Sequence, residues 1–329
     1  MKPAIRFATL VSVAAMLCAA NAAFAKDDLE PRKPGIFVNG MQSEALARWA
    51  LHAKAAAEKL HWQVILKDGQ SNPALIATLL PELVNENVGA VITKAMDATL
   101  IGDGLKAAKA KNIPVISTAI EVDPNGKDQF AANYRPPSYP LGVALSDYLI
   151  NKDPKVIAVG QTISVVFGAD QLVVGAKDEL IKKGGAMEAI ADVDITNLIN
   201  SFGQTAGDLG LGHPKATALI SCCDFAPPID IPALKAVNRT DMLLLTRYGN
   251  ESTLAALRAE APIVTAVNHT DLSNFEAIDA LAAYFANKTP IPATPNHPAT
   301  EIKVIDKSNV PATGSVWSFD ADLAAYGDR

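Results

Sequence analysis

The sequence of 329 residues has few cysteines, no cluster of basic residues and few long apolar runs. Beyond the N-terminal segment, no stretch reaches the roughly 18 consecutive apolar residues that a membrane-spanning helix requires. The 29 lysines and arginines are dispersed and outnumbered by 35 acidic residues, which gives a net charge of −6. Nucleic acids and anionic membrane surfaces favour clustered positive charge, so neither is expected as a partner.

Sequence signatures of catalysis are also missing. No phosphate-binding loop ends in Gly-Lys-Ser/Thr, and Gly207, Gly210 and Gly212 have the wrong spacing for a dinucleotide fingerprint. No Gly-x-Ser-x-Gly nucleophile elbow occurs. None of the five histidines lies at ligand spacing from another histidine or a cysteine. We therefore expect a protein that is not an enzyme and that holds no metal or other cofactor.

The three cysteines are Cys18, near the N-terminus, and the adjacent pair Cys222 and Cys223. Neighbouring Cα atoms across a trans peptide lie about 3.8 Å apart, which is below the usual range for a disulfide. An oxidising compartment permits a disulfide between adjacent cysteines, but only with a strained or cis peptide. Free thiols and a vicinal disulfide are therefore both open.

Residues 1–25 have the features of a secretory signal peptide. Lys2 and Arg6 precede an apolar run that ends near Ala20, and Ala23-Phe24-Ala25 forms a small-x-small cleavage site. The run is short for a transmembrane helix, although a retained anchor is the alternative. We expect export to the periplasm. The mature chain of about 300 residues exceeds the usual size of one domain, so two compact units are expected.

From Gly35 onward, short apolar strand patterns alternate with amphipathic helix patterns. Such alternation indicates parallel sheets that are covered by helices on both faces. About ten such units are too many for one sheet of ordinary size, so two sheets are expected. The proline-rich stretch from Thr289 contains one strand-like piece, 301–305, and is expected to lie over the surface as a strap. The main predicted strands are 35–39, 62–67, 88–93, 113–119, 155–160, 216–222, 242–246 and 263–267.

Several short segments carry a family resemblance. The segment Asp68-Gly-Gln-Ser-Asn-Pro73 is followed by Val88-Gly-Ala-Val-Ile-Thr93, by Asp97 and by AAKAKNIPVI at 107–116. Later come Leu141-Gly142 at a helix start and a strand that ends in Cys-Asp224. In this order, over nearly the whole mature chain, the sequence resembles the type I periplasmic binding proteins of ABC transporters, in the ribose/galactose-binding-like branch.

The resemblance implies an α/β fold with two Rossmann-like lobes, whose parallel sheets are joined by a three-crossover hinge. Residues 26–132 with 268–290 would form the N-terminal lobe, and residues 133–267 with 291–329 the C-terminal lobe. A small-molecule ligand would lie in the cleft and favour the closed form, because it contacts both lobes. The implied partner is the membrane permease of an ABC transporter, and the protein itself is expected to be a monomer.

The resemblance also implies which residues contact the ligand. Ala45 and Leu46 stand where the family has paired aromatics that stack on a sugar, and Leu172 replaces a pocket arginine. Ala119-Ile120 stands where sugar binders commonly have Asp-Arg. The ligand-binding residues predicted in this way, together with aromatic residues expected to wall the pocket, are Gln42, Ser43, Glu44, Asp97, Thr118, Glu121, Tyr134, Phe167, Cys223, Asp224, Tyr248 and Asn268.

Simpler roles stay open for several of these positions. Asp97 can cap the helix that follows it, Phe167 can pack in a core, and Glu121 and Arg247 can be solvated. Because apolar residues replace several hydroxyl-binding groups, we expect a modified sugar, a polyol or a less hydroxylated organic solute. A periplasmic sensor that presents the solute to a receptor kinase or chemoreceptor is the alternative to transport.

Overall fold

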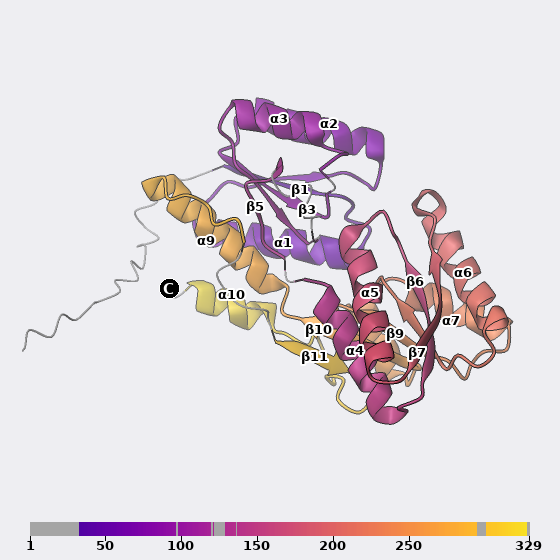
Figure 1. The fold of residues 1–329 in the computed structure, drawn as a ribbon. Helices are drawn as coiled ribbons and strands as arrows, with labels where there is room; N and C mark the ends of the chain where they lie inside the picture. The colour runs from indigo at the N-terminus through magenta and orange to yellow at the C-terminus, as the bar shows by residue number, and fades with distance from the viewer. Residues whose placement is uncertain are drawn as a thin grey trace, which may run out of the picture.

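The computed structural model describes residues 33–96, 98–119, 121, 129–135, 137–294 and 301–327. The predicted signal peptide, 1–25, and the predicted ligand residue Asp97 lie outside the described residues. Two α/β lobes stand beside each other, each built on one sheet with helices on both faces (Figure 1). Among the described residues, no helix is long and apolar enough to cross a membrane.

The first lobe is built on a parallel sheet in the order β2-β1-β3-β4-β5. Strands β1, β3 and β4 are buried along their whole length because helices cover both faces. Asn72 caps the second helix: its side chain accepts hydrogen bonds from the amides of Ala74 and Leu75, and Pro73 takes the first helical position. The elements are β1 (Pro34–Val38), α1 (Glu44–Lys59), β2 (Ile65–Asp68), α2 (Pro73–Asn85), β3 (Ala90–Lys94), α3 (Gly102–Ala110), β4 (Val115–Thr118) and β5 (Ala132–Asn133).

The second lobe is built on a sheet in the order β11-β10-β9-β8-β6-β7, in which only β11 is antiparallel. Helices α4 and α5 pack closely on one another beside this sheet (Figure 1). Its elements are α4 (Tyr139–Lys152), β6 (Ile157–Thr162), α5 (Phe167–Lys182), β7 (Ala186–Asp192), α6 (Leu198–Gly212), β8 (Ala218–Ser221), α7 (Pro227–Ala236), β9 (Leu243–Arg247), α8 (Glu251–Arg258), β10 (Ile263–Asn268) and β11 (Ile302–Ile305), with a 3-10 turn at Ile195–Asn197.

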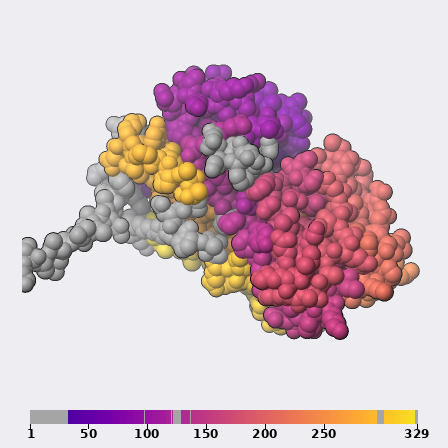
Figure 2. All heavy atoms as spheres, in the orientation of Figure 1, coloured from indigo at the N-terminus to yellow at the C-terminus, as the bar shows by residue number. Residues whose placement is uncertain are grey.

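The chain passes repeatedly between the lobes. It crosses from β5 to α4, from β10 to α9 (Asp271–Asn287), and from α9 back to β11. Helix α9 packs against α1, so this orange segment lies beside the indigo and purple first lobe (Figure 2). The prediction of two lobes with mainly parallel sheets is confirmed. The predicted strand at 301–305 is also confirmed as β11, although it joins the sheet edge by pairing with β10.

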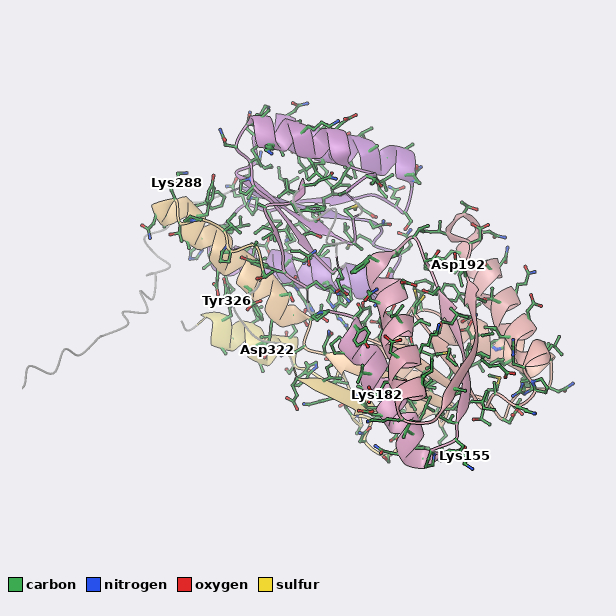
Figure 3. The ribbon with its side chains drawn as sticks, viewed as in Figure 1. Lys155, Lys182, Asp192, Lys288, Asp322 and Tyr326 are labelled. Atoms are coloured by element: carbon green, nitrogen blue, oxygen red, sulfur yellow. The ribbon has the colours of Figure 1, made fainter. Side chains whose placement is uncertain are left out.

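The segment after β11 makes a further passage to the first lobe. Helix α10 (Phe319–Gly327) contacts α1 and α9. The Tyr326 hydroxyl donates to Asp279 on α9 (2.8 Å), and Asp322 pairs with the His269 ring (2.7 Å) (Figure 3). The exact division of the chain between lobes stays a prediction, and α10 is the place where residues after 291 contact first-lobe helices.

One buried carboxyl group in the second lobe predicts a specific pH dependence of stability. Asp230 on α7 is fully buried, and burial raises its pKa to about 8. Its polar neighbours Ser221 and Gln161, which hydrogen-bond to each other (3.1 Å), oppose only part of this rise in pKa. Because the folded pKa lies above the unfolded value of about 4, the protonated form stabilises the fold. The contribution of Asp230 to stability is fully present below about pH 4 and is lost as the pH rises through 8.

Asp230→Asn is therefore expected to stabilise the protein at pH 8 and to have little effect at pH 4. The amide stays neutral, so the variant avoids burying a charge. Its free energy of unfolding at high pH should therefore be higher than that of the wild type by about 1–3 kcal/mol. This corresponds to a Tm higher by about 2–10 °C. Thermal unfolding measured from pH 4 to pH 9 checks the prediction, and parallel pH profiles for variant and wild type would contradict it.

Candidate ligand site between the lobes

Ligands of open parallel sheets bind beyond the carboxyl ends of the strands. In this structure, the residues that follow β4 and β5 in the first lobe meet those that follow β8 and β9 in the second. The contact is direct: the Arg135 guanidinium, after β5, donates to the Ala119 carbonyl oxygen and to the Tyr248 hydroxyl. Side chains of both lobes therefore enclose one buried site.

The aromatic part of the site is a pair that spans the boundary. Trp49, on first-lobe helix α1, is 2% exposed, and its ring lies edge-on to that of Tyr248, with centroids 5.0 Å apart. Tyr248 has φ +74 and Gly249 has φ +55, so two left-handed residues turn the chain from β9 into α8. An aromatic residue in this backbone region is strained, and such strain tends to occur at functional sites.

Two buried arginines flank the tyrosine. The guanidinium carbons of Arg135 and Arg247 lie 4.6 Å and 4.5 Å from the centroid of the Tyr248 ring, and that of Arg135 lies 5.2 Å from Trp49. Arg247 donates to the Ser138 hydroxyl (3.0 Å) and to the Gly168 carbonyl (2.7 Å). Burial lowers the pKa of Arg135 to about 9; the nearby Arg247 charge adds to this, while the carboxylates of Glu121 and Asp224 oppose it.

The acidic residue of the second-lobe site is Asp224, which follows β8. It is 5% exposed and accepts a hydrogen bond from the Asn250 side-chain amide. Burial raises the pKa of Asp224, and the positive charges of Arg247 and Arg48 partly oppose that shift. Asp224 is thus a buried carboxyl group whose ionised form depends on neighbouring arginines.

The adjacent cysteines lie just before Asp224 as free thiols. Both are buried, with their Sγ atoms 3.0 Å apart. The hydrogen bond with Cys222, followed by burial, raises the pKa of Cys223 well above its usual value. A protonated, buried thiol is a weak nucleophile, so this Cys223 lines the site as an apolar group.

A second contact holds the lobes together outside the buried cluster. The carboxylate of Glu44, at the first turn of α1, accepts hydrogen bonds from the Glu251 amide (2.7 Å) and the Ser252 hydroxyl (2.7 Å). These groups belong to the N-terminus of second-lobe helix α8, where unpaired amides and the helix dipole favour a negative charge. Glu44 therefore acts in this arrangement as an interlobe cap.

A small cavity lies beside the aromatic pair. Arg48, Trp49 and His52 of α1 line one side, and Tyr248 and Asn268 line the other, with residues 315–317 closing it. Its volume of about 30 Å³ has room for about two water molecules. A sugar-sized solute can therefore enter only if the lobes separate or the side chains between them move.

Comparison with known proteins identifies the architecture. No protein-family model matches the sequence, and no curated protein matches it. Among solved structures, the glucose-galactose binding protein GanP from Geobacillus stearothermophilus has a TM-score of 0.73 and 19% identity, over 86% of this chain and 100% of its own. An ABC transporter solute-binding protein from Agrobacterium vitis, bound with alpha-D-tagatopyranose, has a TM-score of 0.74 and 17% identity, over 90% of this chain and 98% of its own.

A third solved structure gives the same result. The solute-binding protein of an ABC transporter from Burkholderia graminis, in complex with D-arabinose, has a TM-score of 0.74 and 14% identity, over 87% of this chain and 99% of its own. This chain has the fold of the type I periplasmic binding proteins. At these identities the likeness establishes the periplasmic-binding-protein fold, and the ligand must be argued from the side chains.

Several ligand residues predicted from the sequence lie at the boundary of the two periplasmic-binding-protein lobes. Cys223, Asp224 and Tyr248 are in the buried cluster described above. Glu121 accepts a hydrogen bond from the Ser138 amide (2.8 Å), beside Arg247. Asn268 lines the small cavity, where its side chain accepts a hydrogen bond from the Thr270 hydroxyl (2.8 Å). Glu44 also lies at the boundary, in the contact with α8.

The other predicted ligand residues are not among the side chains described above as forming the buried cluster. Thr118 is buried and donates to the Thr93 carbonyl (3.1 Å) within the first sheet. Tyr134 is buried in the first-lobe core, where desolvation raises its pKa. Gln42 is exposed before α1, Ser43 takes the cap position of α1 without a side-chain cap bond, and half-buried Phe167 begins α5.

Four residues of the site were not predicted from the sequence: Arg48, Trp49, Arg135 and Asn250. Arg135 follows directly after the first predicted lobe boundary, at residue 132, and a lone arginine at a crossover is a signal that could have been used. In the described residues, no group of three or more histidine, cysteine or acidic side chains is placed to hold a metal ion.

Proposed function

We propose that this protein captures a small organic molecule between its two lobes in the periplasm and delivers it to the permease of an ABC transporter. One observation carries the proposal: Trp49 of the first lobe and Arg135 of the β5–α4 crossover meet Asp224, Arg247 and Tyr248 of the second lobe in a single buried cluster. A molecule that contacts both sets of side chains binds the closed form better, and therefore stabilises closure.

The chemistry of the cluster fits binding better than turnover. Its polar groups are guanidinium donors, a carboxyl group and an amide, and its Cys223 thiol has a pKa well above the usual range. Aromatic faces and a few placed polar groups are typical of sites that recognise small molecules. The likeness in fold to ABC transporter solute-binding proteins, together with the predicted signal peptide, supports the periplasmic transport role.

Closure is a measurable consequence of this proposal. Protein stripped of bound molecules by unfolding, dialysis and refolding is expected to have the larger radius of gyration in small-angle X-ray scattering. Adding back the small-molecule fraction released from the purified protein should make the particle more compact, at the mass of a monomer. Identical scattering before and after the addition would contradict a cleft that closes on its solute.

A further inference from the structure

Among the described residues, the buried positive charges around the cleft outnumber the negative ones. Three arginines, Arg48, Arg135 and Arg247, interact electrostatically in this region. Within the described part of the chain, the acidic groups found to act on them are Glu121 and Asp224. Burying a charge without a counter-charge is costly, so this set favours one additional negative charge.

Among the residues that the structure describes, the arginines also have N–H donors without hydrogen-bond partners, which likewise indicates a missing negatively charged group. Arg135 and Arg247 are 5% and 6% exposed, yet the Nε of each has no hydrogen-bond partner among the described residues. The Nε of Arg48, beside the small cavity, is likewise buried without a partner there. Buried N–H groups are nearly always satisfied in native proteins, and each unsatisfied one implies a missing partner. Three unsatisfied guanidinium donors in one region call for an acceptor.

The geometry selects the kind of acceptor. Arg135 and Arg247 both lie against the Tyr248 ring, so their like charges repel, and an anion that reaches both relieves this repulsion. A carboxylate offers two oxygens in the plane that matches a guanidinium edge and carries one charge. A phosphate group carries a charge of about −1.5 to −2, which is larger than the single excess positive charge of this site.

We infer that the solute held between the lobes is a small organic acid, whose carboxylate binds at Arg135 and Arg247 beside Tyr248 and Trp49. The inference rests on the proposed function, because it names the class of solute that the lobes close upon. It narrows the sequence-based expectation of a modified sugar, a polyol or a less hydroxylated organic solute to a solute that carries a negative charge.

Matched pairs of acids and uncharged analogues test this inference. The stripped protein is titrated at pH 7 and constant ionic strength with acetate and acetamide, lactate and lactamide, benzoate and benzamide, and galacturonate and galactose. Calorimetry and thermal shift should show at least one acid that binds about tenfold or more tightly than its neutral partner, the effect of a charge-assisted hydrogen bond. Neutral partners that bind equally well, or no stabilisation by any acid, would overturn the inference.

Two variants assign the effect to the arginines. Arg135→Gln and Arg247→Gln should each abolish the preference for the acid, whereas Lys109→Gln should retain it. Lys109 is exposed on α3, so this control removes one positive charge without touching the cleft. Circular dichroism establishes that each variant is folded. An acid preference that survives both arginine substitutions would overturn the assignment.

The inference and the proposed function fail in different ways. If the protein retains a neutral molecule and closes upon it in scattering, the organic-acid inference is wrong and the solute-binding function stands. If neither charged nor neutral molecules are retained and scattering never changes, the binding function itself is contradicted.

Discussion

Trp49→Ala is expected to yield a folded protein that no longer retains a bound molecule. Trp49 lies on first-lobe helix α1, but its ring packs edge-on against that of Tyr248 in the second lobe and lies beside the Arg135 guanidinium. The contact with Tyr248 joins the two lobes, so we expect it to be lost when they separate. Truncating a buried tryptophan costs about 3–5 kcal/mol, so closure and affinity should fall at least about 100-fold. Native mass spectrometry of the purified variant measures the occupied fraction.

Trp62→Ala is the matched control. Trp62 is 3% exposed, but it is buried within the first lobe, where its ring lies 5.6 Å from that of Phe285. The same truncation there should lower the Tm of the protein and leave the bound molecule in place. If Trp49→Ala retained its molecule at wild-type occupancy, the tryptophan would have no part in the closed site.

Gly142→Ala is expected to destabilise the second lobe strongly. A Cβ at Gly142 on α4 would lie 1.9 Å from the Leu172 carbonyl oxygen, and a Cβ at Gly175 on α5 would lie 2.3 Å from the Tyr139 carbonyl oxygen. The two glycines thus allow the backbones of α4 and α5 to touch where the helices cross. The backbone cannot move aside as a side chain can. We therefore expect the free energy of unfolding to fall by about 3 kcal/mol or more, which lowers the Tm by at least about 6 °C.

Gly212→Ala provides the control for this substitution. Gly212 ends α6, and nothing lies within 4 Å of a Cβ placed there. Alanine is a better helix former than glycine by up to about 1 kcal/mol, so the Tm should stay unchanged or rise slightly. Equal Tm values for the Gly142 and Gly212 variants in thermal unfolding would show that the close helix crossing is not required.

The sequence predicted the fold where strands are continuously apolar. Strands β1, β3, β4 and β8 are fully buried and were found by that pattern. Strand β7 was missed because it lies at a sheet edge, where half-buried and exposed residues alternate. The glycines of α6, including Gly207 and Gly210, weaken the helical signal of its sequence.

Only part of the site could be predicted from the sequence. Family positions located Asp224 and Tyr248 because those residues follow β8 and β9, and strand ends keep their place in this fold. Arg135 follows β5, a strand of only two residues that was not predicted from the sequence. Its role depends on how the chain passes between lobes, and only the three-dimensional structure places its guanidinium against Trp49 and Tyr248. The charge of the site, and with it the class of solute, therefore could not be inferred from replaced family residues alone.

Native mass spectrometry of the mature protein purified from the periplasm is the most direct test of the central claim. Denaturation of the same sample then releases any bound molecule for identification. The account predicts one small organic molecule per chain, bearing a carboxylate. A protein that keeps the mass of the bare chain, even after incubation with the small-molecule fraction of a periplasmic extract, would contradict the claim that the cleft captures a solute.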